Sequence, residues 1–325
     1  MKICVFGAGA IGAHLAARLD AGGAKVSVVV RGAHLAAIRA NGIEVHAPDR
    51  TWTCRVAASD DPRELGRQDV VIVSVKGPSL SSVAAAIPPL LGPDTPVIFV
   101  MNGLPWWYFQ GSGAAIRSRL PAFDFGESAW RGLSSEQVIG GVIFSGSEVV
   151  KPGVVHVDSS GDRLMLGRPD DRPSAIANEV GAILSAGGVK GQVTDRIRHV
   201  IWEKLLRNLT TGPFSVLTTA TPREIFVNDT LTATSKRVVA EAAAVAAAVG
   251  IDLGPDVEPL VESNRIVSHR PSILQDLLLG RPMEVSTLYG RPLLLARATK
   301  VPAPTLEILV ALVEARARAA GLYSE

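Results

Sequence analysis

The stretch MKICVFGAGAIGAHLAARL, residues 1–19, decides the fold of the first half of this chain. A short apolar strand is predicted up to Gly7, and helical periodicity follows. Between them the glycines have the spacing G-x-G-x-x-G: Gly7 allows a tight turn, Gly9 lets a phosphate approach the backbone, and Gly12 lets the helix pack close to the strand. The helix N-terminus adds free N–H groups and the positive end of a dipole. The alternative is a glycine-rich turn without a ligand. The predicted pyrophosphate site consists of Gly7, Ala8, Gly9, Ala10, Ile11 and Gly12.

The second predicted strand indicates which dinucleotide binds. It ends in VSVVVRG, with Arg31 where an NAD site usually has an acidic residue for the ribose hydroxyls. A guanidinium suits a 2′-phosphate, so we expect NADP(H) as the cofactor. The alternative is a solvated arginine at the end of a strand.

Strands and helices alternate through the first half. Residues 69–76 (DVVIVSVK) and 95–103 (TPVIFVMNG) are apolar runs of the kind buried on both faces of parallel sheets. After Gly126, shorter strands within residues 138–168 are predicted to extend the same sheet in antiparallel fashion. We therefore expect an α/β fold, with an N-terminal Rossmann-type parallel sheet and an antiparallel extension, followed by an all-α C-terminal domain.

The domain boundary is predicted near Asp195, because the strand pattern vanishes from Arg196 onward. Residues 1–195 would form an NADP-binding Rossmann-like domain and residues 196–325 a helical substrate and catalytic domain. Helices are expected over Val200–Leu209, Leu231–Val249, Val257–Val267, Ile273–Leu279, Ser286–Ala298 and Thr305–Ala319.

Composition and charge argue against several classes of protein. The 325 residues include 33 basic and 31 acidic side chains, so a net charge of +2 gives no reason to expect a nucleic-acid or membrane partner. The apolar runs are too short for a membrane span. Cys4 and Cys54 have no CxxC spacing and are expected to be reduced thiols of a cytoplasmic protein. The six histidines lack metal-ligand spacing, so no metal is expected.

Polar residues follow two of the buried strands. Lys76 comes directly after one and Asn102 after the next. Ligands of open α/β sheets bind outside the carboxyl ends of the strands, so both side chains are expected to face one crevice. Ordinary loop polarity is the alternative.

A second polar pair lies in the apolar segment HVIWEKLLRNLTTGPF, residues 199–214. Lys204 and Asn208 are four residues apart and therefore share a helical face. A buried lysine is costly unless it has a partner or a task. The alternative is a lysine whose ammonium reaches out to solvent.

Together these features resemble the ketopantoate reductase (2-dehydropantoate 2-reductase) family. The resemblance rests on the glycine pattern, Arg31, the VK and NG strand ends, WEKLLRN (202–208), PSILQD (271–276) and RPMEVSTLYG (281–290). It implies a Rossmann domain followed by a helical domain, with a small 2-oxo acid as the substrate.

The resemblance also implies roles for individual residues. Lys204 matches the catalytic lysine, and Glu284 would hold it charged and oriented or anchor the cofactor. The implied cofactor contacts are Lys76, Asn102, Ser147 and Glu284. The implied substrate contacts are Asn102, Lys204, Asn208 and, at the carboxylate, Ser272.

The chemistry of a 2-oxo acid reduction fits these roles. A hydride must reach the carbonyl carbon and a proton the oxygen, and the Lys204 ammonium would polarise the carbonyl and donate that proton. Two alternatives remain open. SILQ is a capping-box pattern, so Ser272 could simply cap a helix, and Glu284 could be a first-turn glutamate favoured by the helix dipole.

The chain departs from the family pattern in three places. Gly212 stands where ketopantoate-reducing members generally have another asparagine, and Ser286 replaces an acid. The aromatic run WWYF, residues 106–109, would either form a lid or apolar wall for the substrate or pack onto the helical domain. These departures weaken the substrate assignment more than the cofactor assignment.

The expected reaction is NADPH-dependent reduction of 2-dehydropantoate to pantoate, a step of pantothenate biosynthesis. The alternatives are a reductase of another branched or aromatic 2-oxo acid, a 3-hydroxy acid or opine-type dehydrogenase, and a non-catalytic NADP(H)-sensing protein. The alanine-rich segment 238–250 could pack within its domain or form a homodimer.

Overall fold

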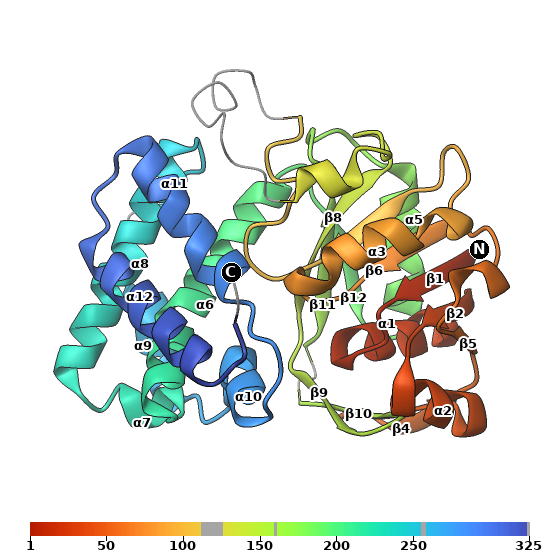
Figure 1. Cartoon of the computed structure of the whole chain (residues 1–325), viewed down its shortest axis with the longest axis horizontal. Helices are drawn as coiled ribbons and strands as arrows, with labels where there is room; N and C mark the ends of the chain where they lie inside the picture. The colour runs from red at the N-terminus through yellow and green to blue at the C-terminus, as the bar shows by residue number, and fades with distance from the viewer. Residues whose placement is uncertain (112–125, 159–160, 255–257, 324–325) are drawn as a thin grey trace. The chain divides into compact units, whose positions relative to one another are not determined.

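The computed structural model describes residues 1–111, 126–158, 161–254 and 258–323, which form two compact units (Figure 1). The first unit contains Met1–Met101 and the described residues from Phe109 to Ile197. The second contains Asn102–Tyr108 and the described residues from Arg198 onward. A short loop from the first half of the chain is therefore part of the helical unit.

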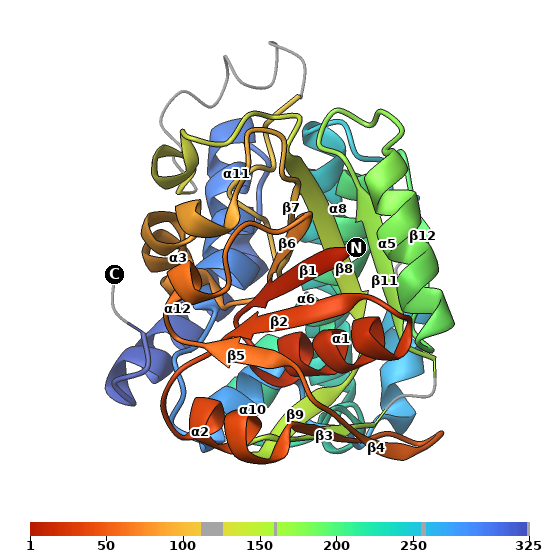
Figure 2. The same cartoon turned by 90° about the vertical axis from the view of Figure 1, so that its right-hand side faces the viewer.

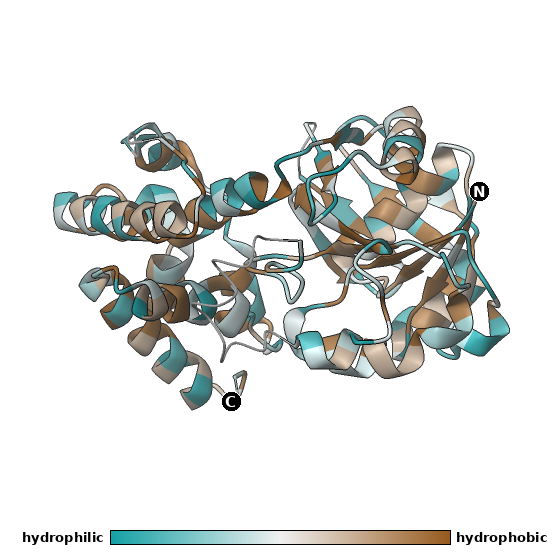
Figure 3. Cartoon of the chain, turned by 90° about the horizontal axis from the view of Figure 1, so that it is seen from above, coloured by the Kyte–Doolittle hydropathy of each residue, from teal (hydrophilic) through white to brown (hydrophobic). Residues whose placement is uncertain are grey.

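The first unit is built on an eight-stranded sheet with helices on both faces (Figure 3). The strand order is β12-β11-β8-β7-β6-β1-β2-β5, and Figure 2 shows β1, β2 and β5 side by side. Neighbours from β5 to β8 are parallel, while β11 runs antiparallel to β8, so the expected antiparallel extension is present. The strands are β1 (Lys2–Phe6), β2 (Lys25–Val29), β5 (Ala57–Ser59), β6 (Val70–Val73), β7 (Val97–Val100), β8 (Val138–Phe144), β11 (Arg163–Gly167) and β12 (Lys190–Val193).

The apolar runs behave as their composition requires. All residues of β6 and β7 are buried, because helices cover the sheet on both sides. One hydrophobic core joins the sheet to the helices α1 and α5. The helices of this unit are α1 (Ala10–Ala21), α2 (Gly32–Asn41), α3 (Leu80–Ala86) and α5 (Ala175–Ala186).

A second, four-stranded sheet corrects one expectation. Two of the strands predicted to extend the main sheet instead pair with an early hairpin, in the order β4-β3-β10-β9. Along β10, Val154, Val155 and Val157 are buried and only His156 is exposed, and a register shift against β9 separates Val154 from Val155. Helix α1 contacts strands of both sheets. The strands are β3 (Ile43–His46), β4 (Thr51–Cys54), β9 (Ser147–Lys151) and β10 (Val154–Val157).

The second unit is helical, as expected. Its elements are α6 (Ile197–Thr218), α7 (Pro222–Ile225), α8 (Asp229–Ala248), α9 (Glu258–Glu262), the 3₁₀ turn η5 (Ser263–Ile266), α10 (Ser272–Leu278), the π-helical turn η6 (Ser286–Gly290), α11 (Arg291–Thr299) and α12 (Pro304–Ala319). The helix predicted over Ser286–Ala298 is thus a π turn followed by an α-helix.

Helix α6 is longer than predicted. It was expected to end at Leu209 but continues through Pro213 to Thr218. Proline removes one helical hydrogen bond and costs about 3 kcal/mol in a helix interior. Residues 209–216 are all buried, so the apolar surface removed from water outweighs this local cost.

Within the described residues, none of the helices combines the length and the apolar character that a membrane span requires.

Candidate functional site

The glycine-rich turn lies between β1 and α1, and its glycines differ in their surroundings. Gly7 has φ +99°, and its N–H donates to the carbonyl of Val29 at 2.9 Å. A Cβ on Gly12 would lie 2.0 Å from the carbonyl oxygen of Gly7 and 2.4 Å from Oγ of Ser74, so glycine is required for close packing there. A Cβ on Gly9 would meet no atom within 4 Å. Gly9 therefore borders open space, as a phosphate-binding turn requires.

Two predicted cofactor residues lie along the same sheet edge as this turn. Phe6, the last residue of β1, is in register with Val29 of β2 and Val73 of β6. Because these three strands are parallel neighbours, their carboxyl ends meet. Arg31 follows β2 as the exposed N-cap of α2, and the partly buried Lys76 follows β6.

Ser147, the remaining predicted cofactor contact in this unit, lies elsewhere. It is the first residue of β9, in the four-stranded sheet, opposite Val157. Its hydroxyl is buried and has no hydrogen-bond partner among the described residues.

In the second unit, three predicted residues from distant parts of the sequence act on one another. Asn102 follows β7, and its side-chain amide donates to Oε2 of Glu284 at 3.3 Å. Glu284 is only 9% exposed, and its negative charge acts on the amine of Lys204 in α6. Glu284 is therefore a buried, hydrogen-bonded carboxylate, and its position just before the helical turn also fits a glutamate favoured by the helix dipole.

The environment of Lys204 changes its acidity. Burial destabilises the ammonium and lowers the pKa of Lys204 to about 8, although the charge of Glu284 acts in the opposite direction. An amine with this pKa can both donate a proton and regain one near neutral pH, which is the property of a general acid.

The two remaining predicted substrate residues lie at helix surfaces. Asn208 is partly buried, one turn beyond Lys204 on α6. Ser272 is exposed and is the first residue of α10. The N-cap of α10 is Pro271 and Ser272 is the first helical residue, so Ser272 does not occupy the N-cap position that the capping-box alternative requires.

The aromatic run after Asn102 is part of the interior. Trp106, Trp107 and Tyr108 are each at most 2% exposed and belong to the second unit. The hydroxyl of Tyr108 accepts a hydrogen bond from Nε1 of Trp202 at 2.6 Å. This supports packing onto the helical domain rather than a solvent-exposed lid. Phe109 is also buried but belongs to the first unit.

Gly212 faces a residue that the sequence patterns did not single out. A Cβ on Gly212 would lie 2.1 Å from the hydroxyl oxygen of Tyr289. The sequence offered one hint of this contact: the asparagine of the family pattern is missing at position 212, which leaves space for another side chain.

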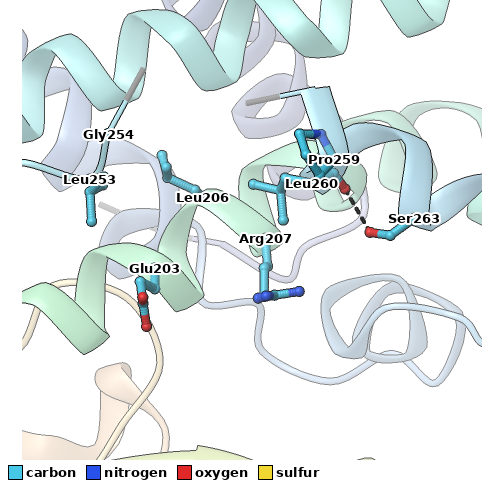
Figure 4. Close-up of a pocket in the computed structure, with 8 residues that line it drawn as sticks. All are labelled: Glu203, Leu206, Arg207, Leu253, Gly254, Pro259, Leu260 and Ser263. Atoms are coloured by element: carbon cyan, nitrogen blue, oxygen red, sulfur yellow. Dashed lines mark hydrogen bonds between the residues drawn. The ribbon is translucent and has the colours of Figure 1, made fainter. Parts of the chain in front are cut away.

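A pocket of about 380 Å³ lies beside α6 (Figure 4). Glu203 and Arg207 of α6 line it together with Leu260 and Ser263. None of the predicted site residues contributes to it. Separately, the described part of the chain contains no cluster of three or more histidine, cysteine, aspartate or glutamate side chains that could hold a metal ion.

Comparison with known proteins agrees with this geometry. A 2-dehydropantoate 2-reductase of Mesorhizobium japonicum is 38% identical over the full length of both chains. The structure of 2-dehydropantoate 2-reductase from Geobacter metallireducens has a TM-score of 0.85 and 26% identity, covering 97% of this chain and 99% of that one. D-mandelate dehydrogenase with NADH and anilino(oxo)acetate has a TM-score of 0.84 at 22% identity, over 99% and 100% of the two chains, and shares the fold.

The fold and the site define an oxidoreductase that uses a nicotinamide dinucleotide. Residues 3–171 match the family model described as ketopantoate reductase PanE/ApbA, and residues 196–317 match its C-terminal model. The chain belongs to the ketopantoate reductase family.

Proposed function

We propose that this protein reduces 2-dehydropantoate to pantoate with NADPH. The observation that carries the proposal is the cluster of Lys204, Glu284 and Asn102, in which a buried carboxylate acts on an amine whose pKa is about 8. The relatives named 2-dehydropantoate 2-reductase support the choice of substrate.

In this mechanism the residues of the second unit prepare the substrate carbonyl. Reduced nicotinamide, when bound, supplies the hydride that adds to the carbonyl carbon. The Lys204 ammonium polarises the carbonyl and transfers its proton to the oxygen, so that a 2-hydroxy acid and a neutral amine result. Glu284 favours the charged form of Lys204, and Asn102 orients Glu284 through their hydrogen bond. We assign Asn208 to the polar groups of the substrate and Ser272 to its carboxylate.

The preference for NADPH over NADH is part of the proposal. Arg31 stands exposed at the sheet edge that carries the glycine turn and suits a 2′-phosphate. Lys76 at the same edge, and Ser147 on β9, complete the proposed cofactor contacts. The open space beside Gly9 fits a pyrophosphate.

The first test is oxidation of NADPH and of NADH by the purified protein. The substrates are 2-dehydropantoate, 2-oxoisovalerate, phenylpyruvate and a blank without acid. We expect fast turnover of 2-dehydropantoate with NADPH. Cofactor binding without turnover of that acid would contradict the substrate and leave the cofactor assignment standing.

A reductase of another branched or aromatic 2-oxo acid is the second candidate. Gly212 favours it, because the asparagine amide of the family pattern is missing at this position. Turnover of phenylpyruvate above that of 2-dehydropantoate would establish this candidate. A non-catalytic NADP(H) sensor has no use for a proton donor, so the cluster of Lys204 and Glu284 counts against this alternative.

Location and assembly complete the proposal. Cys4 and Cys54 are buried free thiols, which supports a reducing compartment, the cytoplasm. A homodimer stays a prediction. The alanine-rich helix α8 contacts α11 and α12 of its own unit, which supports packing within the domain. Light scattering of the purified protein would measure the oligomeric state.

A further inference from the structure

A π-helical turn directly follows Glu284 in the chain. Residues Ser286–Gly290 form this turn, and α11 continues from it. π turns are rare and frequently occur at functional sites. Here the turn carries Tyr289, whose side chain is fully buried within the second unit.

The hydroxyl of Tyr289 points at the helix that carries Lys204. A Cβ built on Gly212 would lie 2.1 Å from this hydroxyl oxygen and 3.5 Å from Cγ2 of Ile273. Gly212 is one turn beyond Asn208 on α6, and Ile273 follows Ser272. The hydroxyl therefore lies where α6, α10 and the π turn meet, next to segments that carry both proposed substrate residues.

No hydrogen-bond partner is present for this hydroxyl among the described residues. A buried hydroxyl without a partner is unfavourable and is usually satisfied by water or by a ligand. Tyr108 provides the contrast, because its buried hydroxyl accepts a hydrogen bond from Trp202. Burial also raises the pKa of Tyr289, so its phenol keeps the proton that it can donate.

We infer that Tyr289 determines substrate specificity by hydrogen bonding to a hydroxyl on the tail of the 2-oxo acid. Its phenol takes the place of the asparagine that the family pattern has at position 212, and Gly212 leaves the space for it. This inference rests on the proposed function, since it concerns the substrate of the same site.

The test compares two acids in the wild type and in Tyr289→Phe. 2-Dehydropantoate and 3,3-dimethyl-2-oxobutanoate differ in the tail hydroxyl alone. We expect kcat/KM for 2-dehydropantoate to fall by about 10-fold in the variant, and that for the acid without the hydroxyl to change by less than about 2-fold, because one hydrogen bond is lost for the first acid only.

Tyr108→Phe is the matched control, since it removes a buried tyrosine hydroxyl whose partner is Trp202. It should change kcat/KM for both acids by the same factor. Equal losses for both acids in Tyr289→Phe would overturn the inference and leave the proposed function intact. A wild type that reduces neither acid would overturn the proposed function, and the inference with it.

A second pair of variants tests the placement of the hydroxyl without using activity. Gly212→Ala should lower the thermal midpoint of the wild type, because its Cβ would overlap the hydroxyl of Tyr289. In the Tyr289→Phe background the same change should be tolerated, since the next ring atom, Cζ, lies 3.4 Å from the Cβ. The same loss in both backgrounds would contradict the contact.

Discussion

The glycine-rich turn and the Lys204 cluster are built in opposite ways. The turn uses the backbone of six consecutive residues, Gly7 to Gly12, in which Gly9 borders open space and Gly12 packs closely against Gly7. The cluster uses side chains, and its hydrogen bond between Asn102 and Glu284 joins residues 182 positions apart. A site made from backbone can be read from a local pattern, whereas a site made from side chains depends on how distant segments pack.

The largest effect is expected from the side-chain site. Lys204→Ala should lower kcat by at least ~100-fold, because the proton donor is lost, while the Kd of NADPH stays nearly the same. Stopped-flow turnover and cofactor fluorescence titration measure the two quantities. Arg207→Ala is the control: Arg207 is three residues away, exposed, and lines the separate pocket. Near-normal turnover in Lys204→Ala would remove the lysine from the mechanism.

A large effect is also expected at the sheet edge, but on the cofactor alone. Arg31→Asp should weaken the binding of NADPH by roughly 10- to 100-fold, since a charge-assisted contact to the 2′-phosphate is replaced by repulsion. NADH, which lacks that phosphate, should be affected far less. Isothermal titration with both cofactors tests this, and an equal loss for both would count against the phosphate contact.

The two glycines of the turn should respond differently to the same substitution. Gly12→Ala should destabilise the fold by roughly 1–3 kcal/mol, because its Cβ would overlap the carbonyl oxygen of Gly7. Gly9→Ala should leave the stability of the fold nearly unchanged. It should weaken the binding of NADPH by about 10-fold, since only a bound phosphate would meet the methyl group. Urea unfolding and cofactor titration of both variants separate these outcomes. Equal destabilisation would mean that Gly9 is structural too.

The smallest effect concerns pH. Lys204 must be protonated to act as the acid, so kcat/KM should fall as the pH rises through about 8. Glu284 raises the pKa of Lys204, so Glu284→Gln should move this inflection to lower pH. Profiles of kcat/KM for both proteins between about pH 5 and about pH 10 test the direction of this shift. An unchanged inflection would show that the two groups are not coupled.

The sequence predicted the parallel sheet because its strands follow from local patterns. β6 and β7 are continuous apolar runs, and such runs pair in the interior of a sheet whatever surrounds them. The sequence-based prediction was wrong for β9 and β10, which were expected in the main sheet, because a short strand with one apolar face can join either of two sheets. The predicted end of α6 was also too early. Pro213 is visible as a local signal in the sequence, whereas the burial that outweighs it depends on the tertiary structure.

The sequence by itself determined the dinucleotide turn, the helical second half and the pairing of Lys204 with Asn208 on one helical face. These depend on periodicity and on glycine, which act within a few residues. Only the tertiary structure decided that Asn102 contacts Glu284, that the aromatic run is core, and that the hydroxyl of Tyr289 fills the space at Gly212. Such contacts join residues far apart in the chain, and they form because packing the interior densely leaves few arrangements for each buried side chain.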